Sequence, residues 1–140
     1  MAFRISTDMK NAMCNEVLSL MAGTNGTSGT ASLKIYSGAQ PASADDGAGT
    51  SGTMLCQIDN IGWNLGTSGT SFLASTSGYQ GTASDAGSAG WARMETVNGF
   101  GTCRIDGDCG IVAGNVFTLN INEFSTGGLV TLLSADIYMA

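Results

Sequence analysis

The residue types that most proteins use for chemistry are scarce in this chain. Histidine is absent, which excludes Ser-His-Asp and Cys-His nucleophilic arrangements and every metal site ligated by histidine. The four cysteines, Cys14, Cys56, Cys103 and Cys109, form no paired C-x-x-C motif, and no G-x-x-x-x-G-K-[ST] phosphate loop occurs. We therefore expect no catalytic residues, no cofactor and no structural zinc.

The carboxylates are the remaining candidates. Asp45 and Asp46 are adjacent, and Asp106-Gly107-Asp108 forms a D-x-D pair, but a calcium loop needs more oxygen ligands and a glutamate at its twelfth position. Aspartates in turns more often bind their own backbone. A glycosidase needs two facing carboxylates, and no motif pairs the glutamates, which are Glu16, Glu95 and Glu123. The sequence predicts neither a metal site nor an enzyme.

Two cysteines flank a sequence that is typical of a turn. Asp106-Gly107 predicts a tight turn, which would place Cys103 and Cys109 opposite each other on paired strands. A disulfide between them is one interpretation. Reduced, buried thiols are the interpretation that we favour, because a reducing cytoplasm keeps cysteines reduced.

Composition and charge exclude other classes. The 140 residues are 43% hydrophobic and 11% charged, which predicts one folded domain over residues 1–140. The net charge is −6 and the five basic residues are scattered, so we expect no nucleic-acid binding. No apolar run reaches the roughly 20 residues that a membrane span needs. The charged N-terminal stretch does not resemble a signal peptide, so we expect folding in a cytoplasm.

A helix is expected over residues 6–22, followed by a flexible connector over 23–30. Ser6 or Thr7 can cap the helix, and Gly23 can end it. One helical face carries apolar residues at helical spacing: Met9, Met13, Val17, Leu20 and Met21. This face is a core surface in the more usual interpretation, or a docking surface rich in methionine.

Alternating apolar and polar residues predict antiparallel strands over residues 31–140. The pattern is present in "ASLKIYS", "TMLCQIDN" and "NVFTLNIN", and "GLVTLLSADIYMA" is long enough for a bent or central strand. Asn98-Gly99 predicts a hairpin between "WARMETV" and "FGTCRI". Short strands separated by Gly-rich loops predict a mainly β fold, an antiparallel β-sandwich or jelly roll preceded by one helix.

The two tryptophans allow two interpretations. Trp63 and Trp91 could stack on sugars, but tryptophan is highly buried on average. We favour a structural role, as a core residue or an interface anchor.

The stretches "IYSGAQP", "FRISTDMKNAM", "SAGWAR" and "DGDCG" resemble motifs of a family of small virion structural proteins of tailed bacteriophages. "IYSGAQP" with Ala44 and Asp45 is the strongest stretch, and it is followed by "GTML". "FRISTDMKNAM" is similar to the opening of that family, "SAGWAR" to its central strand and "DGDCG" to the turn after it. This chain departs from the pattern in its longer Gly/Thr loops and in Cys103 and Cys109.

The resemblance implies a virion structural protein that is not an enzyme and has no catalytic residues. The expected role is a capsid decoration or cement protein, a homo-oligomer that we expect to be a trimer, bound to the major capsid protein. We expect "YSGAQPASADDG" to form an extended arm that touches another subunit. The predicted subunit contacts are Tyr36, Gln40, Pro41, Asp45, Trp91, Met9 and Met13. A tail or host-contact component, with Trp63, Tyr79 and the loops binding a receptor or glycan, is the alternative.

Overall fold

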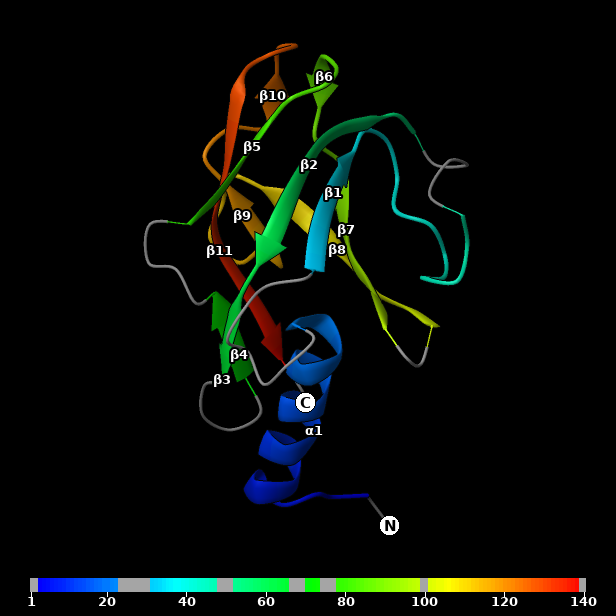
Figure 1. Cartoon of the computed structure of the whole chain (residues 1–140), viewed down its shortest axis with the longest axis vertical. Coiled ribbons are helices and arrows are strands. Elements are labelled where there is room, and N and C mark those ends of the chain that lie inside the picture. Colours follow the sequence, from blue (N-terminus) through cyan, green and yellow to red (C-terminus); the bar gives the residue numbers. More distant parts are fainter. Residues whose placement is uncertain are drawn as a thin grey trace.

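The computed structural model is mainly β with one N-terminal helix, as the sequence predicts (Figure 1). It describes residues 3–22, 31–47, 52–65, 70–73, 78–98 and 101–138. The predicted connector 23–30 therefore lies outside the described residues. The elements are α1 (Thr7–Ala22), β1 (Ala31–Tyr36), β2 (Met54–Ile61), β3 (Trp63–Leu65), β4 (Thr70–Leu73), β5 (Tyr79–Thr82), β6 (Gly87–Ser88), β7 (Trp91–Asn98), β8 (Gly101–Gly110), β9 (Phe117–Leu119), β10 (Glu123–Phe124) and β11 (Leu129–Tyr138).

One sheet contains most of the strands and almost closes on itself. Its order is β2-β1-β7-β8-β9-β11-β4-β3, with β5 also paired to β11, and among the described strands only the β8–β9 pair in this sheet is parallel. β5 approaches β2, where Cys56 and Ala83 form an isolated bridge and the Ser84 amide donates to the Leu55 carbonyl at 2.8 Å. A sandwich or jelly roll is compatible with this nearly closed sheet. A separate two-stranded sheet pairs β6 with β10.

The strand alternation places one set of side chains inside this sheet. Leu33, Ile35, Ile58, Phe117 and Leu132 belong to a single core cluster, each fully buried. β11 is the predicted central strand, since it pairs with β4, β5 and β9. Its register shifts between Leu132 and Ser134, where the intervening Leu133 turns outward and is 49% exposed.

The helix begins where its cap predicts. The Ser6 side-chain oxygen accepts from the Met9 amide at 3.3 Å, and the Ser6 carbonyl accepts from the Lys10 amide. The buried side of α1 is formed by Cys14 and Met21, and α1 lies against β3, β4 and β7. The N-terminal half extends away from the sheet (Figure 1).

The structure corrects the core interpretation of the methionine face. Met9 is 54% exposed and Met13 is 41% exposed, whereas Met21 is buried. The first half of α1 extends past the end of the sheet, so no apolar layer among the described residues is there to cover Met9 and Met13.

The structure also corrects the turn predicted at Asp106-Gly107. Both residues lie inside β8, opposite Arg93 and Ala92 of β7. A Cβ on Gly107 would lie 2.8 Å from Val116, so the glycine allows close packing of the neighbouring segment. Cys103 and Cys109 consequently lie on one strand, about 20 Å apart along it, and cannot bridge each other. The predicted β7–β8 hairpin is confirmed by the pairing of Asn98 with Gly101.

Candidate interaction surface

The outer face of the β1, β7 and β8 strands carries three ion pairs. Residues alternate across a strand, so Ala92 and Met94 point into the core and Arg93 points to the opposite face. Strand register then places Arg93 between Lys34 of β1 and Asp106 of β8. We call this side of the sheet the outer face.

A buried ion pair lies at the centre of the outer face. Arg93 donates from Nε to Asp106 Oδ1 at 2.6 Å and from an Nη to Asp106 Oδ2 at 2.7 Å, and the two side chains are 2% and 4% exposed. The hydrogen bonds from Arg93 to Asp106 raise the pKa of the guanidinium, against the opposing effect of burial. Arg93 is therefore charged at every physiological pH, and this two-bond pair fixes its orientation.

Two aromatic side chains lie beside this ion pair. The rings of Tyr36 and Trp91 are stacked, with centroids 4.6 Å apart, and the Arg93 guanidinium carbon is 5.4 Å from the centroid of the Trp91 ring. Burial raises the pKa of the Tyr36 hydroxyl. The Trp91 Nε1 is buried and has no hydrogen-bond acceptor among the described residues.

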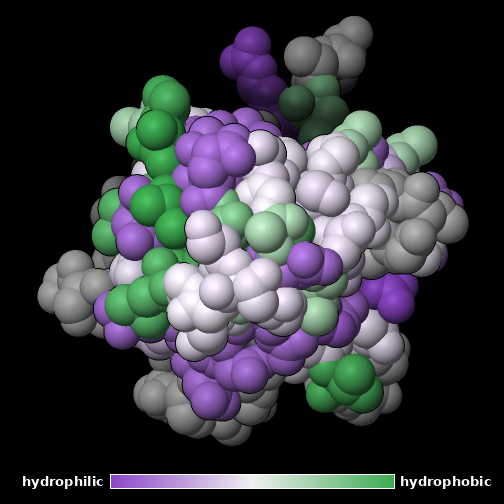
Figure 2. Space-filling view, turned by 90° about the horizontal axis from the view of Figure 1, so that it is seen from above, coloured by the Kyte–Doolittle hydropathy of each residue, from purple (hydrophilic) through white to green (hydrophobic). Residues whose placement is uncertain are grey.

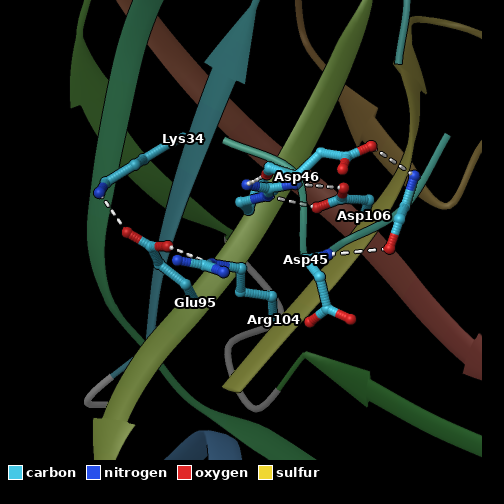
Figure 3. Close-up of polar contacts among 8 residues, drawn as sticks. Lys34, Asp45, Asp46, Glu95, Arg104 and Asp106 are labelled. Atoms are coloured by element: carbon cyan, nitrogen blue, oxygen red, sulfur yellow. Dashed lines mark hydrogen bonds and ion pairs between the residues drawn. The ribbon is translucent and has the colours of Figure 1, made fainter. Parts of the chain in front are cut away.

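A more exposed cluster of charges lies next along the same strands. Glu95 accepts from Lys34 Nζ through Oε1 and from Arg104 Nε through Oε2 at 3.4 Å (Figure 3). Burial alone would raise the pKa of Glu95, but its hydrogen bonds with Lys34 and Arg104 and their charges lower it below its usual value. These partly exposed pairs contribute little to stability.

The segment Ser37–Gly47, which we call the strap, lies against the outer face. It contains its own turn, because the Asp46 amide donates to the Ser43 carbonyl and the Ser43 amide donates to Asp46 Oδ2. Arg93 Nη1 donates to the Asp46 carbonyl at 2.8 Å and joins this turn to the sheet (Figure 3). The Asp45 carboxylate extends away from the turn.

Several carboxylates on and beside the outer face are engaged by neighbouring side chains. Asp106 and Glu95 are each engaged by basic side chains, and Asp59 accepts hydrogen bonds from Gln57 and Ser32 that lower its pKa. Within the described ranges, no group of three or more cysteine and acidic side chains is placed to hold a metal ion.

The predicted contact residues fall into two separate places. Tyr36, Gln40, Pro41, Asp45 and Trp91 belong to the strap and the adjoining outer face, whereas Met9 and Met13 lie on α1. Gln40 and Asp45 are exposed and Pro41 is half-buried. Their role as subunit contacts stays a prediction.

The burial of the aromatic side chains limits what they can contact. Tyr36 is 7% exposed, and Trp91 and Trp63 are 0% exposed, so Trp91 and Trp63 are internal residues of the folded chain. A contact between Trp91 and another subunit would require this buried ring to become accessible.

The Arg93–Asp106 pair is not among the contacts that the sequence predicts. The alternation in "WARMETV" places Trp91, Arg93 and Glu95 on one strand face, and this was the available signal. The local sequence Asp106-Gly107 predicts a turn, so it does not indicate Asp106 as the partner of Arg93.

Apolar side chains are also exposed elsewhere. Figure 2 looks down on the end of the molecule where β6 and β10 lie, and its apolar residues gather toward one side of a mostly polar face. The large exposed apolar side chains among the described residues are Phe3, Met9, Met13, Met54, Val97, Ile111, Val112, Leu129 and Leu133. Of these, Phe3, Met9 and Met13 belong to the projecting N-terminal segment.

In the part of the chain that the structure describes, no helix has the length and apolar character needed to cross a bilayer. Comparisons with family models, with curated proteins and with solved structures found no match.

Proposed function

We propose that this chain is a structural subunit of a tailed-phage virion. Its role is that of a capsid decoration protein, which binds the shell as a homo-oligomer and contacts the major capsid protein. The motif resemblance at "IYSGAQP" supplies the class, and the exposed first half of α1 is the structural observation that supports a binding role.

The helix end has the character of a contact surface. Phe3 is 91% exposed, and Met9 and Met13 lie one helical turn apart, both exposed. Flexible methionine side chains adapt to irregular partner surfaces, and apolar groups left exposed together in a small domain mark interaction sites. We assign the contact with the shell to this end of α1.

The alternative role at the tail has less support. It relied on aromatic side chains as a receptor or glycan surface, and Trp63 has no exposed area. Tyr79 is half-buried, with its hydroxyl donating to the Gly62 carbonyl at 3.4 Å.

The first test is to locate and count the chain in intact particles by cryo-electron microscopy and quantitative mass spectrometry. The proposal expects many copies on the shell. A few copies confined to the tail would overturn the decoration role and leave the tail role.

A second test addresses the helix directly. The Met9→Glu/Met13→Glu double variant should reduce shell binding by about tenfold or more, because it places charge in an apolar contact. Asn15→Glu adds charge to an exposed polar position of the same helix and is the matched control. Equal binding of the double variant and the control would remove α1 from the contact.

A further inference from the structure

The strap occupies more chain than its hairpin requires. The Ser37 amide donates to the Thr53 carbonyl, and the Thr53 amide donates to Ser37 Oγ, both at 3.0 Å, so the ends of β1 and β2 are joined at this point. About two to five residues normally close such a hairpin. Here residues 38–52 intervene. The extra length is available for a function outside the hairpin.

The strap is structured internally, and few of its own residues are buried. The turn between Ser43 and Asp46 is held by its own hydrogen bonds. From Gly38 to Gly47, every residue is exposed except Pro41 and Ala44, which are half-buried. The turn can therefore leave the sheet as a unit while it loses little burial of its own apolar side chains.

The position that the turn occupies on the sheet is built independently of the strap. Asp106 holds Arg93 through two hydrogen bonds, and this leaves Nη1 directed at the Asp46 carbonyl. A buried charged donor needs an acceptor. Any chain that presents the same carbonyl on the same turn satisfies this requirement, including the strap of another copy.

We propose that the strap is exchanged between copies of this chain, so that Asp46 of one copy accepts the hydrogen bond from Arg93 of the next. Exchange of an identical segment preserves every contact of the closed form and is a low-cost route to an oligomer. Gly38 and Gly52, with φ of 82° and 132°, provide the pivots at the two ends. The shorter arm, from Asp46 to Thr53, spans about 23 Å when extended, and this length sets the limit on how far away the Arg93 of a neighbouring copy can lie.

Concentration controls this exchange. In a dilute monomer the strap binds its own sheet, because the intramolecular contact has the higher effective concentration. Closely spaced copies make the exchanged form competitive. The inference rests on the homo-oligomer in the proposed function, and it is tested without particles.

The experiment mixes equal amounts of ¹⁴N- and ¹⁵N-labelled full-length chain that carries a benzoylphenylalanine photocrosslinker in place of Asp45. Asp45 is exposed on the strap and its carboxylate extends away from the turn, so the substitution leaves the Ser43–Asp46 hydrogen bonds in place. The mixture is assembled at high concentration, irradiated and digested. The masses of crosslinks between the strap and β7 or β8 are then read.

Exchange predicts that about half of these crosslinks join a light and a heavy chain, as random pairing of copies requires. In the control the crosslinker replaces Val112, which is 67% exposed between β8 and β9. This control should not give that proportion of crosslinks between light and heavy chains. The exchange would be overturned if crosslinks joined only light to light and heavy to heavy chain. It would also be overturned if the chain stayed monomeric at high concentration. If an oligomer forms but no crosslink joins a light to a heavy chain, the exchange fails while the decoration role stands. If mixed crosslinks form but the chain is absent from shells, the exchange stands and the decoration role fails.

Discussion

At the scale of single residues, Arg93 has the most demanding position in the molecule. It is a nearly fully buried cation whose charge is compensated by Asp106, and it also contacts Trp91 and the Asp46 carbonyl. Removing one member of such a pair leaves an uncompensated buried charge, which costs far more than the pair contributes when both are present.

Asp106→Ala should therefore lower the free energy of unfolding by about 3–5 kcal/mol. Urea denaturation followed by tryptophan fluorescence measures this loss. The Arg93→Met/Asp106→Leu double variant is the control and should lose less, because it removes both charges and keeps side-chain volume. A loss below about 1 kcal/mol for Asp106→Ala would show that the pair behaves as an exposed one.

Cys109 supports a prediction on pH. Burial, assisted by the charge of Asp108, raises the pKa of this thiol to about 12. The unfolded chain releases the proton near its ordinary pKa of about 8.5, while the folded chain retains it. The contribution of the protonated Cys109 thiol to the free energy of unfolding is thus complete below the pKa of the unfolded chain. This contribution is lost as the pH rises toward 12.

The free energy of unfolding should fall between these pH values, by up to about 1.4 kcal/mol per pH unit for this group. Cys109→Ala should flatten the slope. Cys56 and Tyr36, whose pKa values burial also raises, contribute in the same direction and keep a residual slope in that variant. An unchanged slope in Cys109→Ala would contradict the assignment.

At the scale of elements, the approach of β5 to β2 decides whether the sheet closes. A Cβ on Gly81 would lie 2.5 Å from the Gln57 carbonyl oxygen and 2.9 Å from Ile58 Cγ1. Any larger residue at this position would therefore force β5 or β2 to move.

Gly81→Ala should destabilise the fold by about 1–3 kcal/mol, the usual cost of overpacking. Gly47→Ala is the matched control, because no atom lies within 4 Å of its Cβ position, and it should change stability by less than about 1 kcal/mol. Thermal unfolding of both variants measures the difference. Similar melting of the two would mean that β5 and β2 do not pack as described.

Elements with local signals were predictable from the sequence. Ser6 marked the start of α1, and the alternation around Leu33 and Phe117 marked β1 and β9. The exposure of Met9 and Met13 was not predictable, because helical spacing gives a face but not the length of the surface that covers it.

The candidate site was predictable only in part. "IYSGAQP" indicated the strap, but the pairing of Arg93 with Asp106 depends on the register between β7 and β8. Asp-Gly has the same local sequence in a turn and in a strand. The pairing with β7 and the packing of Val116 against Gly107 distinguish the two, and neither contact is visible in the local sequence.

At the scale of the whole molecule, one core joins the helix to both halves of the sheet. Met21 of α1 and Trp63 of β3 belong to the same cluster as Leu33 and Leu132. Loss of any element exposes side chains that others need, so we expect cooperative unfolding.

Unfolding followed by far-UV circular dichroism and by tryptophan fluorescence should give coincident transitions. Trp63 reports on the core and Trp91 on the outer face, so Trp63→Phe and Trp91→Phe separate the two signals. In each variant the fluorescence midpoint is compared with the circular dichroism midpoint. A mismatch in one variant but not in the other would indicate that the core and the outer face unfold separately.

The central position of β11 has a consequence for synthesis. β4, β5 and β9 all pair with this strand, and residues 129–138 are translated after every one of them. A nascent chain therefore cannot complete its sheet until these residues have left the ribosome. Fragments released early by interrupted translation lack the strand that joins the others, and they are excluded from any assembly that requires the finished fold.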